Sequence, residues 1–185
     1  MDTEKKLSGL TVALHWLVAL SILTLCGVGI YMVQTEAWPL YHIHKSIGLL
    51  IFTLIIARVA WRIVNGLPKP VREFSRFEHL AAKTVHWLLL LGTLAMPLTG
   101  MLFSGASGHG FGIFGWEIFP ANYAPDKPGQ AIPLNAAWSD LGQALHGYLG
   151  YLLLALIALH VAGALKHHIL DKDHTLSRML GRRAE

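Results

Sequence analysis

The chain has 185 residues, of which 54% are hydrophobic and 14% charged, with a formal net charge of +4. This composition is too apolar for an ordinary water-soluble domain and indicates a membrane protein. Its basic residues flank apolar stretches instead of forming one patch with interleaved aromatics, so we expect no nucleic-acid partner.

Four stretches are apolar enough, and long enough at about 20 residues, to cross a bilayer. They cover residues 10–33, 43–64, 82–103 and 141–165. Strands are not expected, because these runs lack the alternating pattern of a membrane barrel. We therefore predict an all-α fold, a transmembrane four-helix bundle that takes in residues 1–185 as a single domain.

The basic residues also predict how the bundle is oriented. All but Lys45 and Lys127 of the 15 lysine and arginine residues fall on one side of the predicted spans. Basic segments stay on the cytoplasmic side of a membrane. Both termini are therefore predicted to be cytoplasmic, and the long Gly- and Pro-rich segment 104–138 external.

The lone Cys26 excludes a disulfide or thiolate metal site.

The first two predicted spans carry polar residues where burial is costly. His15 lies inside the first span, and the second begins at His44 on the external side. Arg58 follows His44 by fourteen residues, on nearly the same helical face. It either binds an acidic group of a cofactor or extends to the headgroups, as Arg62 is expected to do. Lys45 either attracts an anionic donor, pairs with such an acidic group, or anchors the helix at the interface.

The third and fourth spans add three more histidines. His86 lies near the membrane depth of His15, and the fourth span holds His146 and His160. The fourteen residues between these two advance a helix by about 21 Å and rotate it to within about 40° of the starting face. The fourth helix therefore presents one imidazole at each of two membrane depths.

Opposed histidines from facing helices are what a haem iron with two axial imidazoles requires. The expected pairs of iron ligands are His15 with His160 and His44 with His146. The chain lacks a C-x-x-C-H motif, so two non-covalent b-type haems are predicted. His86 is the rival of His15: it is either an alternative ligand or a contact to a haem propionate, a quinone or a neighbouring helix. Arg58 is the candidate partner of a propionate.

Glycines lie within one helical turn of the proposed ligands, where a flat cofactor would need close approach of the backbone. These are Gly48, Gly147 and Gly150. The other histidines fall at interfaces or in loops and are expected to be incidental. They are His42, His79, His109, His167, His168 and His174.

The residues argued for above lie in four short stretches of sequence. These are ALHWL around His15, HKSIGLL from His44, HGYLGY from His146 and the tail LHVAGALKHHILDKDHTLSRM, which includes His160. In this order they resemble the bacterial cytochrome b561 family of small four-helix, di-haem inner-membrane proteins. The resemblance implies haem ligation at these four histidines and electron transfer across the membrane to or from quinone.

The resemblance also implies candidate activities and partners. Members are described as superoxide oxidases, which implies an oxidoreductase that takes electrons from superoxide and reduces ubiquinone. The alternative is a cytochrome b subunit that anchors a partner dehydrogenase or hydrogenase. A haem-free metal transporter is disfavoured, because the predicted spans hold almost no carboxylates. The expected partners are the lipid bilayer, ubiquinone or menaquinone, and superoxide or a periplasmic protein as donor. The expected location is the bacterial inner membrane.

Overall fold

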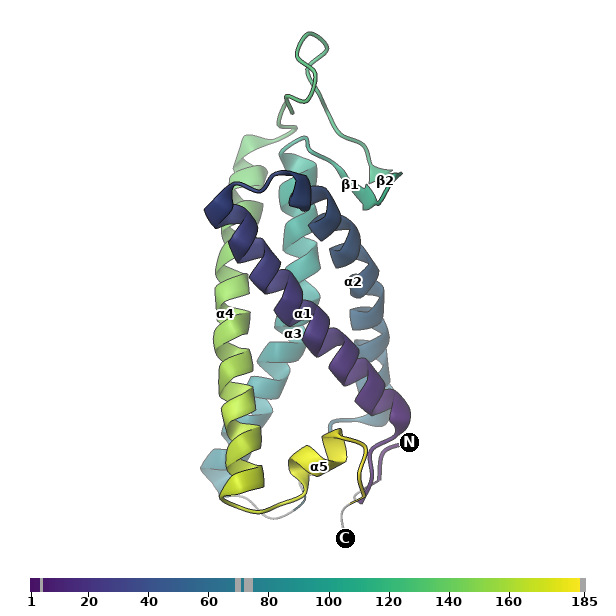
Figure 1. Ribbon diagram of the computed structural model, residues 1–185, viewed down its shortest axis with the longest axis vertical. Coiled ribbons are helices and arrows are strands. Elements are labelled where there is room, and N and C mark those ends of the chain that lie inside the picture. The colour runs from purple at the N-terminus through teal and green to yellow at the C-terminus, as the bar shows by residue number, and fades with distance from the viewer. Residues whose placement is uncertain (4, 69–70, 72–74, 184–185) are drawn as a thin grey trace.

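Four long helices make up most of the computed structural model, which describes residues 1–3, 5–68, 71 and 75–183 (Figure 1). They are α1 (Gly9–Thr35), α2 (Pro39–Asn65), α3 (Arg76–Ala106) and α4 (Ala136–Ile169). Each contains an apolar window long enough to cross a membrane. The predicted four-helix bundle is therefore confirmed. Every helix runs a few residues past its predicted span, because backbone hydrogen bonding continues into the polar interface.

Side-chain caps set where three of these helices begin. The Ser8 hydroxyl accepts a hydrogen bond from the backbone N–H of Thr11 at the start of α1. Ser75 and Glu78 form a reciprocal capping box at the start of α3. The Asn135 side chain accepts a hydrogen bond from the backbone N–H of Trp138 at the start of α4. Each cap satisfies a backbone donor that the helix itself leaves unpaired.

The two ends of the bundle differ in what they carry. Both termini lie at one end, here called the terminal end, and the segment between α3 and α4 covers the opposite end, the loop end (Figure 1). α1 crosses the bundle diagonally, whereas α3 and α4 make the most extensive helix contact. A Cβ atom at Gly142 would lie 2.6 Å from the backbone nitrogen of Phe103. Only glycine therefore permits this approach of α4 to α3.

A fully apolar cluster fills the middle of the bundle. It contains Val18, Ile22, Cys26, Ile55 and Leu153, all of them buried. Leu153 is 0% exposed and lies midway between the two histidines of α4. Cys26 is thus a packing residue, and the polar levels at the two ends are separated by side chains that exclude water.

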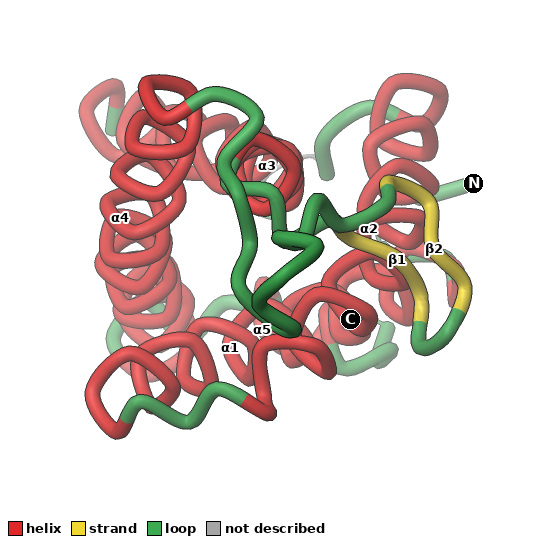
Figure 2. The backbone as a smooth tube through the Cα atoms, turned by 90° about the horizontal axis from the view of Figure 1, so that it is seen from above, coloured by secondary structure: helices red, strands yellow, loops and turns green. Residues whose placement is uncertain are grey.

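The loop end contains a small β-hairpin. β1 (Phe111–Ile113) and β2 (Trp116–Phe119) pair antiparallel. The expectation of a chain without strands is therefore wrong for this segment, where aromatic and β-branched residues flank a tight turn and pack against α2. Seen from above, the hairpin lies on the outer flank of the bundle beside α2, and the rest of the loop crosses the end of the bundle (Figure 2).

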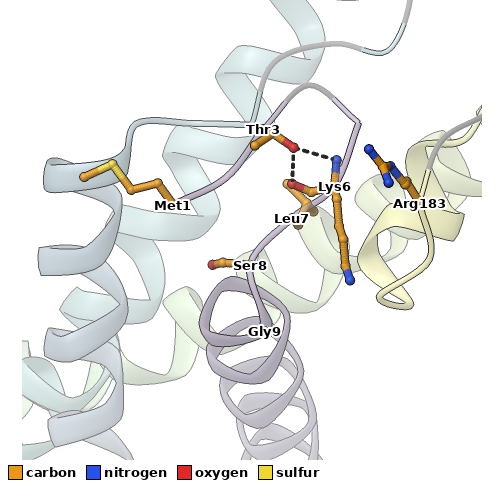
Figure 3. A pocket seen from close by; sticks show the side chains of 7 residues that line it. All are labelled: Met1, Thr3, Lys6, Leu7, Ser8, Gly9 and Arg183. Atoms are coloured by element: carbon orange, nitrogen blue, oxygen red, sulfur yellow. Dashed lines mark hydrogen bonds between the residues drawn. The ribbon is translucent and has the colours of Figure 1, made fainter.

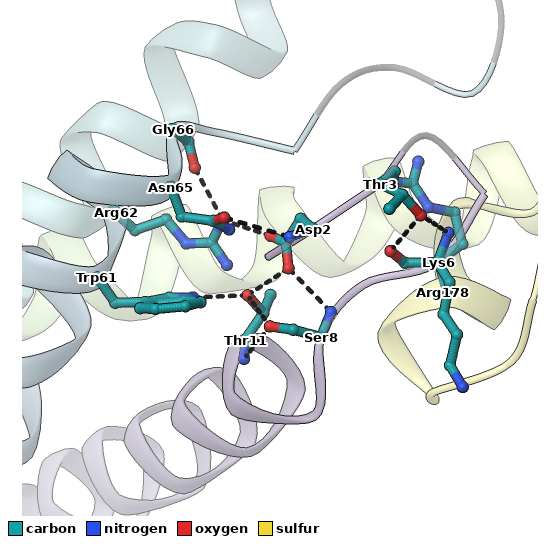
Figure 4. A network of polar contacts seen from close by, with 10 residues as sticks. All are labelled: Asp2, Thr3, Lys6, Ser8, Thr11, Trp61, Arg62, Asn65, Gly66 and Arg178. Atoms are coloured by element: carbon teal, nitrogen blue, oxygen red, sulfur yellow. Dashed lines mark hydrogen bonds and ion pairs between the residues drawn. The ribbon is translucent and has the colours of Figure 1, made fainter.

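A polar network closes the terminal end (Figure 4). The Asp2 carboxylate accepts hydrogen bonds from the Ser8 backbone N–H at 2.9 Å and the Thr11 hydroxyl at 2.7 Å, and it pairs with Arg62 at 3.2 Å. Burial raises the pKa of Asp2, but these hydrogen bonds and the Arg62 charge outweigh it, so the pKa lies below its ordinary 3.8. The expectation that Arg62 extends to the headgroups is wrong, because its side chain is only 8% exposed in this network.

The C-terminal segment folds back across the terminal end. It forms the short helix α5 (Thr175–Met179), which lies beside the start of α1 (Figure 1). The Trp16 indole N–H donates to the Met179 carbonyl at 2.8 Å, and Arg178 donates to the Thr3 carbonyl at 3.2 Å. The tail therefore packs on the bundle instead of trailing from it.

Candidate functional site

Two pairs of histidines face one another at opposite ends of the bundle. His15 of α1 faces His160 of α4, with ring centroids 6.2 Å apart and ring planes at 58°. His44 of α2 faces His146 of α4, with centroids 6.3 Å apart and planes at 83°. The structure therefore brings together both pairs that the sequence predicts, one near the terminal end and one near the loop end.

The ring separations can be compared with what one iron atom requires. An imidazole nitrogen binds a metal at about 2 Å, and its ring centroid lies about 1 Å further away. Two rings on opposite sides of one iron therefore have centroids about 6 Å apart. Both pairs meet this requirement. The His86 ring lies only 5.2 Å from the His160 ring, which is about 1 Å too close to share an iron in this arrangement.

Hydrogen bonds fix the His146 ring and show which nitrogen is free for a metal. Its Nδ1 lies 3.0 Å from the Met96 carbonyl and 3.1 Å from the Thr99 hydroxyl, which itself donates to that carbonyl. A carbonyl can only accept, so Nδ1 carries the hydrogen and Nε2 keeps its lone pair. Such a partner orients a metal-binding imidazole and raises its basicity.

The Nδ1 atom of His44 differs from that of His146. It is buried and has no hydrogen-bond partner within the described residues. A buried imidazole nitrogen without a partner is costly. A group bound from outside the protein would satisfy this nitrogen, so the surroundings of His44 fit a residue that binds a ligand better than a packing residue.

Two glycines border the rings at the loop end. A Cβ atom at Gly100 would lie 3.0 Å from Cε1 of His146, and one at Gly29 would lie 3.6 Å from Cε1 of His44. The sequence argument did not assign a ligand contact to either. The contact of Gly29 could have been predicted from the sequence, because the tight turn between α1 and α2 places residues 29 and 44 at matching membrane depths.

The glycines named from the sequence behave differently. A Cβ atom at Gly48 or Gly147 would meet no atom within 4 Å, and one at Gly150 would contact the Met96 side chain at 3.3 Å. Packing within the protein therefore does not require glycine at the first two positions. Their role beside a flat cofactor stays a prediction.

Arg58 provides a positive charge near the terminal-end histidines. It interacts electrostatically with His15, His86 and His160. Within the part of the chain that the structure describes, it forms no ion pair with a carboxylate. A cation inside a membrane bundle is costly without an anionic partner. Arg58 is therefore suited to an acidic group of a bound cofactor.

Lys45 connects the loop to the bundle. Its ammonium donates to the Gly110 carbonyl at 2.9 Å and to the Ser104 hydroxyl at 3.2 Å. These partners are neutral, so its positive charge persists beside His44. The structural role of Lys45 is therefore to hold the loop, not to anchor the helix at the membrane interface. Its interaction with an anionic donor or a propionate stays a prediction.

A third histidine cluster lies where α4 meets the C-terminal segment. His167 Nδ1 is 2.9 Å from an Asp171 oxygen and 3.4 Å from an Asp173 oxygen. These groups are close enough for a metal ion, but the Lys166 ammonium lies 2.7 Å from the same Asp171 oxygen. The cluster is therefore better described as an ion-pair junction that holds the tail. The expectation that His167 is incidental is wrong.

A shallow pocket beside the start of α1 is separate from the histidine pairs (Figure 3). It is lined by Met1, Thr3, Lys6, Leu7, Ser8, Gly9 and Arg183. None of the span histidines lines it, so it is not the cofactor site.

A four-helix membrane bundle with an opposed pair of imidazoles at each end is the arrangement of a membrane cytochrome. Comparison with known families agrees: the family model described as "Prokaryotic cytochrome b561" matches residues 6–182. The chain belongs to the prokaryotic cytochrome b561 family. It is therefore an integral inner-membrane electron-transfer protein that binds b-type haem.

Three relatives match over most of the chain. "Cytochrome b561 homolog 2" of Escherichia coli is 36% identical over 98% of this chain and 94% of its own length. "Cytochrome b561 homolog 1" of the same bacterium is 27% identical over 85% of this chain and 80% of its own length. "Probable superoxide oxidase CybB" of Yersinia pestis is 28% identical over 96% of this chain and 97% of its own length.

Proposed function

We propose that the chain holds two b-type haems, one between His15 and His160 and one between His44 and His146, and moves electrons between a periplasmic donor and membrane quinone. The observation that carries this proposal is the pair of ring separations, 6.2 and 6.3 Å, each of which fits one iron. When bound, haem supplies reversible one-electron oxidation and reduction.

The surrounding residues would hold, orient and insulate these cofactors. Hydrogen bonding to Met96 would orient the His146 ring and leave Nε2 to bind the haem iron. The positive charge of Arg58 would offset the negative charge of a haem propionate at the terminal end. The apolar cluster around Leu153 keeps water out of the space between the two levels.

The loop end is the proposed entry for the donor. We assign it to the periplasm, since the basic residues are concentrated at the terminal end. Superoxide is the proposed donor, supported by the name of the Yersinia relative and by the Lys45 charge beside His44. In the overall reaction, two superoxide ions each lose one electron and become dioxygen, while one ubiquinone gains two electrons and two protons.

His86 is proposed as a contact for quinone or propionate rather than as an iron ligand. Its ring lies beside His160 at a separation too short for a shared iron. An imidazole can both accept and donate a proton, so His86 is suited to transferring protons to a reduced quinone. This role places quinone reduction at the terminal end.

The test uses purified protein in lipid nanodiscs without any other polypeptide. We expect two haems per chain, and reduction of a soluble ubiquinone analogue when superoxide is generated in the medium. One haem or none per chain would contradict the ligand assignment. Two haems with no quinone reduction, restored by a partner dehydrogenase or hydrogenase, would instead identify an electron-transfer subunit.

A further inference from the structure

The β-hairpin at the loop end exposes large apolar side chains. Phe114 is 51% exposed, Trp116 is 72% exposed and Ile118 is 50% exposed. Of the nine residues from Phe111 to Phe119, Glu117 alone carries a charge. A cluster of this kind is unfavourable in water and marks a surface that contacts something apolar.

The turn of the hairpin holds one of these side chains at an energetic cost. Phe114 has a φ of 45°, in the left-handed region that bulky residues rarely enter. Its backbone N–H donates to the Ser46 hydroxyl at 2.9 Å, which fastens the turn to α2. Glycine would relieve the strain, so the sequence keeps a large apolar side chain where the backbone disfavours one.

The attachment to Ser46 sets the depth of the hairpin. Trp38 and Tyr41 stack at the start of α2 with ring centroids 5.4 Å apart, as expected of aromatics at a membrane interface. Ser46 lies five residues beyond Tyr41, which places it about 7.5 Å further along the helix. The turn therefore reaches past the aromatic pair towards the membrane interior, on the outer flank of the bundle (Figure 2).

The flank of α2 around the attachment of the hairpin is also apolar and exposed. Ile43 is 45% exposed, Ile47 is 36% exposed and Leu50 is 41% exposed, and their spacing places them on one face of the helix. This face belongs to a membrane-spanning helix. The apolar hairpin tip is thus continuous with a surface that lipid covers.

We propose that the tip of the hairpin, formed by Phe114, Trp116 and Ile118, is inserted in the lipid leaflet at the loop end and anchors the loop there. The base of the hairpin is held to the same helix, α2, through Lys45 and the Gly110 carbonyl. The hairpin is thereby fixed to α2 at its base and at its turn, at the end of the bundle that contains the His44 and His146 pair.

The proposal is tested with single-cysteine variants that carry a nitroxide spin label. In a Cys26→Ala background, Trp116→Cys and Ile118→Cys place the label on the tip. Lys127→Cys is the matched control, because Lys127 is an exposed residue of the same loop and lies outside the β-hairpin. The full-length protein is reconstituted with haem in phosphatidylcholine–phosphatidylglycerol nanodiscs.

Power-saturation measurements then compare collisions of the label with oxygen, which partitions into lipid, and with a water-soluble nickel chelate. A nitrogen-equilibrated sample corrects for relaxation caused by haem iron. We expect the oxygen-to-nickel ratio at position 116, 118 or both to be several-fold higher than at 127. Any other result overturns the proposal: ratios equal to the control place the tip in water, and shielding from both reagents indicates that protein covers it.

Discussion

The contact between Gly100 and the His146 ring gives a prediction whose size follows from the structure. In Gly100→Ala, the new methyl group would lie 3.0 Å from Cε1 of His146, whereas ordinary contact begins at 3.4 Å. The ring must therefore move by about 0.4 Å, away from α3. Met96 lies one turn earlier on the same helix, so the 3.0 Å bond from Nδ1 to its carbonyl lengthens to about 3.4 Å.

The weakening of this hydrogen bond should in turn weaken the cofactor site. Partners of this kind typically contribute about 10- to 100-fold in metal affinity, equivalent to about 1.4–2.7 kcal/mol. We expect Gly100→Ala to be purified with a reduced haem content that approaches one per chain. Haem titration, followed by absorbance, should show weakened binding at a single site.

Gly29→Ala is the matched control. Its new methyl group would lie 3.6 Å from Cε1 of His44, which is ordinary contact, so both haems should be retained. Alanine also favours a helix over glycine by about 0.5–1 kcal/mol, so general destabilisation would not account for a loss in Gly100→Ala. Equal haem affinity in the two variants would refute the proposed link between Gly100, the Met96 bond and metal binding.

Three further predictions concern the ligands and the terminal end. His160→Ala should remove one haem and His146→Ala the other, giving distinguishable reduced-minus-oxidised spectra; unchanged haem counts in both would contradict the assignment. His86→Ala should keep both haems but slow quinone reduction. Loss of a haem in this variant would make His86 the iron ligand in place of His15. Asp2→Asn should lower the stability at pH 7 by about 1–3 kcal/mol, through loss of charged hydrogen bonds. Because the folded-state pKa of Asp2 is lowered, its contribution is present above pH 3.8 and is lost as the pH falls further, so melting curves of Asp2→Asn and parent protein should converge in acid.

The spans and their order could be predicted from the sequence because each depends on local properties. About 20 consecutive apolar residues determine a membrane helix wherever the rest of the chain lies. The two depths on α4 follow from the spacing of His146 and His160, since the rise and rotation of a helix are fixed. The partners expected across the bundle for these two residues were an inference from depth alone.

The sequence by itself therefore determined the membrane class, the four helices and the histidines at two depths. Only the tertiary structure decided which atoms meet: His15 at 6.2 Å from His160 while His86 lies at 5.2 Å, and Arg62 on Asp2 instead of in the headgroups. The physical reason is that periodicity describes one helix, whereas distances between helices depend on crossing angles. Those angles are set by close contacts such as Gly142 against Phe103, which no local pattern encodes.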